Sequence, residues 1–316
     1  MNEVIRTAVI GVGSMGRHHA RVYREMEDTE LVGVFDEDEY QASAVATAHG
    51  TNAFGSIEEL LSAGVDAVSI AVPTSKHAEI AIRAMEAGIH VLVEKPIAGS
   101  LRDATAMMDS ARINDRLLMV GHIERFNPAI RTLTAHIDAN EILAVNVVRV
   151  GPRPPRIKDA GVIIDLAVHD IDLAFFLTGR STDDVFAVTS SMPMEHEDTA
   201  SMLLRLSGGI AVQLTANWIT PYKAREVQVI TQERLYRADL ITKTVKAFSR
   251  STGGTGYVVE DLPVRVEEPL KAELGAFIHS VRFGLPAPIS ARDGIRALEV
   301  AVRATGFKHT RLQRAA

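Results

Sequence analysis

Short apolar runs alternate with amphipathic segments through roughly the first 120 residues. The runs are Thr7–Ile10, Leu31–Phe35, Ala67–Val72, His90–Val93 and Leu117–Val120, and segments with helical periodicity lie between them, such as Lys76–Ala87 and Leu101–Ile113. Nearly continuous apolar strands separated by helices are typical of a parallel sheet covered on both faces. The pattern therefore predicts a doubly wound α/β domain over residues 1–122, with right-handed crossovers.

The pattern changes after about Gly121, and a second domain is expected over residues 123–316, in keeping with the chain length. An apolar helix is predicted at Val162–Leu177 and a loop at Gly151–Pro155. The β-type runs that follow are Val185–Met192, Ser201–Leu206, Ile210–Trp218 and Glu226–Ile230, with a hairpin turn predicted at Ser207-Gly208-Gly209. Helical patterns return at Leu270–Phe283 and Gly294–Thr305. This order predicts an α+β domain.

Composition narrows the classes of function. The net charge of −6 and the sequence pI of about 6.0 give no electrostatic sign of nucleic-acid binding. The absence of cysteine excludes disulfides, thiolate metal sites and cysteine nucleophiles. The sequence contains neither a signal-peptide pattern nor an apolar stretch near the roughly 20 residues that span a bilayer. We therefore expect a cytoplasmic protein with no membrane partner.

A glycine-rich turn follows the first apolar run and opens a helix through Tyr23. It fits G-x-G-x-x-G and reads Gly11-Val12-Gly13-Ser14-Met15-Gly16. Gly11 permits the tight turn, Gly13 lets the backbone approach a pyrophosphate, and Gly16 lets helix and strand pack closely. The helix N-terminal amides then face the phosphates. This context predicts a dinucleotide site.

Asp36 ends the second predicted strand, twenty residues after Gly16. A carboxylate there accepts hydrogen bonds from the adenosine ribose and repels a 2′-phosphate, and Glu37 and Asp38 add to that repulsion. The sequence therefore predicts NAD rather than NADP as cofactor. The alternative is a glycine turn followed by a helix-capping aspartate, with no ligand.

The tripeptide Glu94-Lys95-Pro96 lies at the carboxyl end of a predicted strand, where ligands bind in open α/β sheets. Pro96 restrains Lys95 to an extended backbone, which gives its ammonium a defined direction. Such a lysine can hydrogen-bond a substrate hydroxyl and stabilise a developing alkoxide. The alternative is a solvated lysine in a turn.

Ionisable residues interrupt the apolar helix, and Asp165, His169 and Asp172 share one of its faces by their spacing. A histidine beside a carboxylate is the usual general base for a hydroxyl proton near neutral pH. Asp165 could orient the imidazole or hold the substrate. Two alternatives are a solvated helix face and a divalent-metal site built from Asp-x3-His-x2-Asp.

With these motifs, the chain resembles the glucose–fructose oxidoreductase and inositol dehydrogenase (Gfo/Idh/MocA) family over essentially its whole length. The resemblance implies that Lys95, Asp165 and His169 contact the reacting hydroxyl, with His169 as base and Asp172 near the substrate. It also implies an open, mainly antiparallel sheet in the second domain that forms a homodimer or homotetramer. Further cofactor contacts are implied at Ala71, Pro73, Thr74, His77, Glu94 and Lys95. One departure is Ala160-Gly161-Val162, where the family often has several glycines.

A narrower resemblance is to prokaryotic UDP-N-acetylglucosamine 3-dehydrogenases, which oxidise the sugar C3 hydroxyl to a ketone that a partner aminotransferase uses. It rests on Ala71–Thr74, Val120–Pro128, Val150–Arg156 and Ala216–Pro221. The alternatives are a dehydrogenase of a free polyol or sugar acid, an enzyme with tightly held NAD and no net redox, and a non-catalytic dinucleotide-sensing protein.

A basic loop precedes the apolar helix and carries Arg153, Arg156 and Lys158 among two further prolines. The planar guanidinium suits phosphate because it makes paired, charge-assisted hydrogen bonds. The loop therefore predicts a substrate with a diphosphate. The alternatives are a solvated or packing role, and contact with the NAD pyrophosphate. We expect no metal requirement.

Overall fold

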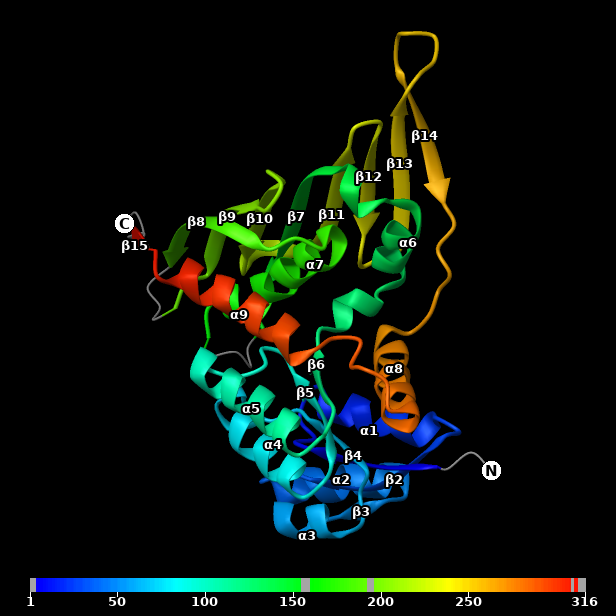
Figure 1. The fold of residues 1–316 in the computed structure, drawn as a ribbon, viewed down its shortest axis with the longest axis vertical. Helices are drawn as coiled ribbons and strands as arrows, with labels where there is room; N and C mark the ends of the chain where they lie inside the picture. The colour runs from blue at the N-terminus through cyan, green and yellow to red at the C-terminus, as the bar shows by residue number, and fades with distance from the viewer. Residues whose placement is uncertain (1–3, 155–159, 192–195, 308–309, 312–316) are drawn as a thin grey trace. The chain divides into compact units, whose positions relative to one another are not determined.

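The computed structural model describes residues 4–154, 160–191, 196–307 and 310–311, and the chain forms two compact units (Figure 1). The first unit comprises Met1–Ile123 and Glu268–Arg296, and the second comprises Glu124–Glu267 and Ala297–Ala316. The predicted division between residues 122 and 123 lies one residue from the first crossing between the units. It omits the return of Glu268–Arg296 to the first unit.

The first unit contains a parallel sheet with the strand order β3-β2-β1-β4-β5-β6, which confirms the predicted doubly wound fold. From β1 the chain adds strands first on one side, to β3, and then on the other side, from β4 to β6. Open α/β sheets bind ligands at this switch point, between β1 and β4. Its strands are β1 (Ile5–Ile10), β2 (Thr29–Phe35), β3 (Asn52–Ala53), β4 (Ala67–Ile70), β5 (His90–Glu94) and β6 (Leu118–Gly121).

Helices cover both faces of this sheet. α4 packs against α5, whereas α1 packs against α2 and α8 (Figure 1). Side-chain caps fix where several begin, since Asp38, Ser56 and Ser100 each accept a backbone amide of the helix that follows. The helices are α1 (Gly16–Glu25), α2 (Glu39–His49), α3 (Ile57–Ser62), η1 (Thr74–Lys76), α4 (His77–Glu86), α5 (Leu101–Ile113) and α8 (Pro269–Phe283). The short helix η2 (Ile123–Phe126) follows β6 and belongs to the second unit from Glu124 onward.

The second unit is built on a mainly antiparallel sheet with the order β14-β13-β12-β11-β7-β10-β9-β8-β15, as the α+β prediction requires. The pairs β7–β10 and β8–β15 are parallel. Its strands are β7 (Ile142–Pro152), β8 (Thr182–Ser191), β9 (Thr199–Leu206), β10 (Ala211–Asn217), β11 (Ile219–Thr231), β12 (Arg234–Asp239), β13 (Thr244–Arg250), β14 (Tyr257–Leu262) and β15 (Thr310–Arg311).

Alternating burial along these strands gives the sheet one packed face. On β9, Met202, Leu204 and Leu206 are buried, whereas the residues between them are exposed. The helical elements of the unit are α6 (Pro128–His136), η3 (Ala139–Glu141), η4 (Ile163–Ala167) and α7 (Val168–Thr178), and α9 (Ala291–Thr305) enters it at Ala297. Figure 1 shows α6 and α7 on the same side of the sheet, and their apolar residues complete its core.

Two local expectations differ from the structure. Gly151 and Pro152 end strand β7, although they were predicted as the start of a loop. The predicted helix Val162–Leu177 exists, but its first turn, Ile163–Ala167, is π-helical before the regular helix α7 begins. Across the described ranges, no helix is both long and apolar enough to cross a membrane.

Candidate functional site

The glycine turn lies at the carboxyl end of β1, held between two neighbouring strands. The Gly11 amide donates to the Phe35 carbonyl at 2.7 Å, and the Ala71 amide donates to the Ile10 carbonyl at 2.8 Å. Gly11 has φ +84°, and a Cβ there would lie 2.7 Å from Val72. A Cβ on Gly16 would lie 1.8 Å from the Gly11 carbonyl oxygen, so the turn and the helix can meet only through glycine.

Gly13 has a different reason to be glycine. A Cβ there would meet no heavy atom of the described residues within 4 Å, so the protein's own packing does not require it. Helix α1 begins three residues later, and within its described first turn there is no acidic residue and no side-chain cap. Space at Gly13 and uncapped amides at Gly16 are what a dinucleotide pyrophosphate needs, so these residues fit the predicted cofactor.

Asp36, directly after β2, braces this turn. Its Oδ2 accepts from the Val12 amide at 2.7 Å and from Gln41 Nε2 at 3.0 Å, while Oδ1 accepts from the Asp38 amide at 3.0 Å. The carboxylate therefore lies beside the turn, where the ribose contact was predicted. It also links the turn to the start of α2, a structural task that the sequence did not reveal.

The two acidic neighbours of Asp36 have partners of their own. Glu37 forms an ion pair with Lys76, and Asp38 caps α2 by accepting from the amides of Tyr40 and Gln41. Their expected repulsion of a 2′-phosphate is therefore partly offset. We assign the cofactor preference to Asp36.

The unmodified protein is expected to prefer NAD over NADP by about 100-fold in kcat/KM, or roughly 2.8 kcal/mol. The double variant Asp36→Ser/Glu37→Arg is expected to reverse much of this preference, because it removes two carboxylates, frees Lys76 from its ion pair with Glu37 and adds a guanidinium that can bind a 2′-phosphate. Its NAD activity is expected to fall as well, since Val12 loses its acceptor. Steady-state kinetics with both cofactors test this, with Glu37→Gln as the control. Equal kcat/KM for the two cofactors in the unmodified protein would contradict the assignment.

Glu94 is the last residue of β5, and Lys95 follows it at the same edge of the sheet; the Lys95–Pro96 peptide bond is cis. Lys95 is half-buried. Ala71 and Pro73 follow β4 on the neighbouring strand, and Thr74 begins η1. The structure thus gathers the predicted cofactor loops at the carboxyl ends of β1, β4 and β5.

His77 has a different position from the one predicted. It is 1% exposed, and its Nδ1 and Nε2 lie 3.0 Å from the backbone carbonyl oxygens of Pro96 and Val72. Burial lowers the pKa of His77, and the two carbonyls oppose that shift only partly. The ring links the loop after β4 to the loop after β5. We therefore reassign His77 from cofactor contact to support of these loops.

In the second unit, Asp165 lies in the π-helical turn and His169 in the first turn of α7, and both are half-buried. Asp170 and Asp172, on the same helix, are buried. A π-helical turn adds a residue to the helix and is frequent at functional sites. Asp165 and His169 are therefore the ionisable side chains of this helix that keep partial exposure.

Glu197 secures the beginning of this helix, a role that no motif in the sequence indicates. Its Oε1 accepts from the Ile163 amide at 3.1 Å, and its backbone carbonyl accepts from the Val162 amide at 3.0 Å. A Cβ on Gly161 would lie 2.1 Å from the Glu197 carboxyl group. The single glycine of Ala160-Gly161-Val162 thus makes room for the cap.

Asp172 was predicted near the substrate, but its carboxylate pairs with Arg125 within the second unit. It is 1% exposed, and its two oxygens accept from Arg125 Nε at 2.8 Å and Nη2 at 2.5 Å. Arg125 also stacks over the Phe176 ring, with 5.0 Å to its centroid. The pairing and the burial argue against substrate contact, and we reassign Asp172 to fixing η2 against α7.

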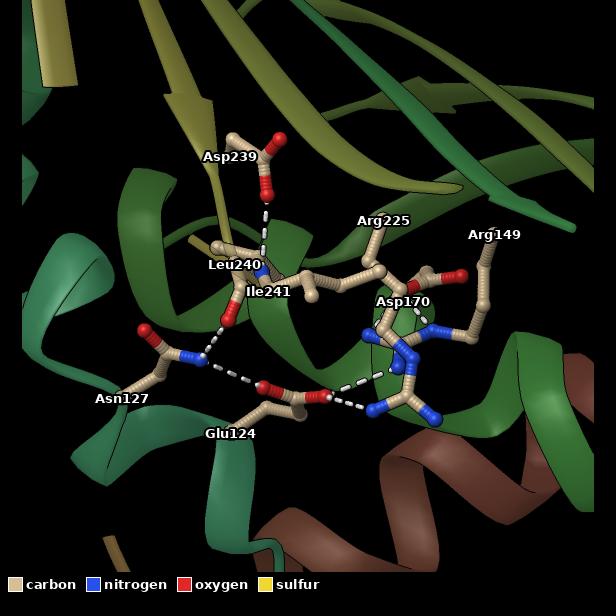
Figure 2. Close-up of polar contacts among 8 residues, drawn as sticks. All are labelled: Glu124, Asn127, Arg149, Asp170, Arg225, Asp239, Leu240 and Ile241. Carbon is tan, nitrogen blue, oxygen red and sulfur yellow. Dashed lines mark hydrogen bonds and ion pairs between the residues drawn. The ribbon is translucent and has the colours of Figure 1, made fainter. Parts of the chain in front are cut away.

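Figure 2 shows a second ionic network, which includes Asp170 of α7. Arg149 of β7 donates to Asp170 Oδ1 and to Glu124 Oε1, both at 2.8 Å. Arg225 lies 3.4 Å from the same Glu124 oxygen, and Asn127 donates to the other at 3.2 Å. Burial raises the pKa of Asp170 to about 6 despite the Arg149 charge. At Glu124 burial also acts to raise the pKa, but Arg149, Arg225 and Asn127 together lower it.

The basic loop is described only in part. The Arg153 guanidinium lies over the Trp218 ring, 5.2 Å from its centroid, and Arg153 is half-buried. Arg156 and Lys158, predicted with it, lie outside the described residues. Across the described parts of the chain, no group of three His, Cys, Asp or Glu side chains is placed to hold a metal ion. Independence from metal stays a prediction.

Comparison with known proteins gives two family matches along the chain. Residues 5–122 match the model described as oxidoreductase family, NAD-binding Rossmann fold. Residues 129–236 match the model described as GFO/IDH/MocA C-terminal domain. The two matched segments fall on the two folded units.

Among curated proteins, UDP-N-acetylglucosamine 3-dehydrogenase from Acidithiobacillus ferrooxidans is 35% identical over 98% of this chain and 99% of its own. A solved structure of that enzyme has a TM-score of 0.90 and 34% identity, covering 95% of this chain and 96% of its own. The scyllo-inositol 2-dehydrogenase (NAD(+)) from Bacillus subtilis is 29% identical over 96% of this chain and 94% of its own.

Proposed function

Because this chain belongs to the Gfo/Idh/MocA family of NAD-binding oxidoreductases, we propose that it oxidises the C3 hydroxyl of UDP-N-acetylglucosamine to a ketone. The observation that carries the proposal is the near full-length similarity to a UDP-N-acetylglucosamine 3-dehydrogenase. The position of Arg153, half-buried over Trp218, agrees with a substrate that carries phosphate.

Each predicted catalytic residue has a proposed role in this reaction. NAD, when bound, accepts a hydride from the sugar carbon. His169 takes the hydroxyl proton, and Asp165 orients the imidazole or the substrate. Lys95 donates a hydrogen bond to the same oxygen and stabilises its negative charge as the C–H bond breaks. The products are the 3-keto sugar nucleotide, NADH and a proton. The glycine turn and Asp36 hold the cofactor.

Arg153→Ala is expected to raise KM for UDP-N-acetylglucosamine about tenfold with little change in kcat, because one charge-assisted hydrogen bond contributes roughly 1.5–3 kcal/mol. Steady-state kinetics with NAD measure this, and Arg156→Ala is tested beside it. The control is Arg205→Ala, an exposed cation paired with Asp184 in the same unit. A rise confined to KM for NAD would assign the loop to the cofactor. Faster turnover of free sugars than of sugar nucleotides would overturn the diphosphate proposal.

A second candidate is oxidation of a free inositol, favoured by the similarity to the scyllo-inositol 2-dehydrogenase over most of the chain. A substrate panel followed by NADH absorbance separates the two. Turnover of scyllo- or myo-inositol in preference to UDP-N-acetylglucosamine would replace the first proposal with the second.

We also propose that the chain forms a homodimer or homotetramer through the outer face of the second unit's sheet, and that an aminotransferase uses the ketone product. The sheet exposes Phe186 at 57%, Val188 at 57% and Leu203 at 52% on adjacent strands β8 and β9. Clustered exposed apolar side chains of this size mark interaction surfaces. A ketone at C3 is the group that an aminotransferase converts to an amine.

A further inference from the structure

A buried histidine connects the phosphate-binding helix to the segment that carries Lys95. His19 is 0% exposed and lies on α1, three residues beyond Gly16. Its Nε2 lies 3.1 Å from Glu94 Oε1, at the end of β5. This pair joins elements 75 residues apart in the sequence, within the first unit.

Glu94 acts as the acceptor in this pair. Burial alone would raise its pKa, but the hydrogen bond and charge of His19, with the charge of Lys95, lower the pKa of Glu94 overall. An ionised carboxylate only accepts, so His19 donates from Nε2. The other oxygen, Oε2, accepts from the Lys95 backbone amide at 3.2 Å. Glu94 therefore touches both His19 and Lys95.

Glu273 of α8 is a second buried carboxyl group of the first unit, and the charge of Glu94 acts on it. Glu273 is 0% exposed, and neither of its oxygens has a hydrogen-bond partner among the described residues. Burial, followed by the charge of Glu94, raises the pKa of Glu273 well above its ordinary value. Two adjacent buried carboxyl groups do not both ionise, and the one with the hydrogen bonds keeps the negative charge.

We propose that His19 is a positioning residue for Lys95: it fixes the Glu94 carboxylate, which in turn fixes the Lys95 backbone and the direction of its ammonium. The inference rests on the proposed function in that Lys95 is taken to contact the reacting oxygen. It assigns His19 no contact with substrate. The phosphate-binding helix and the lysine are thereby held in one arrangement.

The test compares three variants. His19→Leu removes the donor, and His19→Gln keeps a side-chain amide donor near the position of Nε2. Tyr23→Phe is the control, because Tyr23 lies one turn further along α1 and its hydroxyl bonds Ser69, not Glu94. Each is measured for kcat and KM, for the Kd of NADH by fluorescence, for Tm, and for the rate at which a lysine-directed acylating reagent labels Lys95, read by peptide mass spectrometry.

His19→Leu is expected to lower kcat about 10–100-fold, as misplacement of a reacting group does, with KM and the Kd of NADH within about twofold. Labelling of Lys95 is expected to become about threefold faster as its segment loosens. His19→Gln is expected to restore most of kcat and to return the labelling rate of Lys95 close to that of the unmodified protein. Tyr23→Phe is expected to lower Tm only. Identical effects of His19→Leu and Tyr23→Phe, or no recovery with His19→Gln, would overturn the proposal.

The labelling experiment needs no substrate, so it separates the two proposals. If the unmodified protein oxidises no sugar, the proposed function fails while the labelling rates still decide whether His19 positions Lys95. If the unmodified protein is active and labelling of Lys95 is unchanged by His19→Leu, the positioning role fails alone.

Discussion

Replacement of His169 by Asn, or of Lys95 by Met, is expected to lower kcat for UDP-N-acetylglucosamine by about 10²–10⁴-fold, the usual contribution of a general acid–base group. Asn cannot take a proton near neutral pH, and Met fills the lysine's space without a hydrogen-bond donor. The glycine turn and Asp36 are assigned to the cofactor phosphates and ribose, and the cofactor contact implied for Lys95 is one of several. The Kd of NADH, measured by fluorescence titration, is therefore expected to stay within about threefold.

Two matched variants control for general damage. His136→Asn replaces a histidine of α6 in the same unit as His169, and the Nδ1 atom of His136 lies 2.8 Å from the Thr132 carbonyl oxygen of its own helix. Lys76→Met removes an exposed cation of the same unit as Lys95. Both are expected to keep kcat within about threefold. If His169→Asn retained most of the activity, another group would have to be the base.

The fold was largely predictable because its signals are local in the sequence. Continuous apolar strands alternating with helical segments identified the first unit, and the Ser207-Gly208-Gly209 turn located the β9–β10 hairpin. The return of α8 to the first unit was not predictable, because an amphipathic helix such as Pro269–Phe283 does not encode its packing partner. The π-helical turn was not predicted, because its apolar pattern resembles that of an α-helix.

The candidate site was predictable in its motifs and less so in its partners. The glycine turn and Asp36 are defined by short, fixed spacings. The family resemblance assigned Asp172 and His77 to ligands, but their partners are distant in sequence or lie in the backbone. Arg125 is 47 residues from Asp172, and Glu197 is 34 from Ile163. Spacing in the sequence carries no information about such pairs.

Arg149→Met is expected to lower the free energy of unfolding by about 3–5 kcal/mol, the cost of breaking a buried ion pair by removing one partner. Arg149 is 2% exposed and lies between two buried carboxylates, Asp170 and Glu124 (Figure 2). Met has similar volume and no charge. Both carboxylates then lose their closest cation, and Asp170, whose pKa burial already raises to about 6, becomes harder still to ionise.

The loss is expected to appear as a fall in Tm of roughly 10 °C, at about 2–4 °C per kcal/mol for a unit of this size. Arg237→Met is the control, because Arg237 of β12 forms a partly exposed ion pair with Glu226 of β11. Such exposed pairs contribute about 0–1 kcal/mol to the free energy of unfolding. The triple variant Arg149→Met/Glu124→Gln/Asp170→Asn tests the cause, since it removes the charges that Arg149 compensates. The triple variant is expected to recover at least half of the decrease in Tm.

The same network also bears on activity, because Asp170 adjoins His169. Arg149→Met is therefore expected to lower kcat, and the triple variant is expected to recover part of kcat. Equal Tm values for Arg149→Met and Arg237→Met would mean that the network does not hold α7 against the sheet.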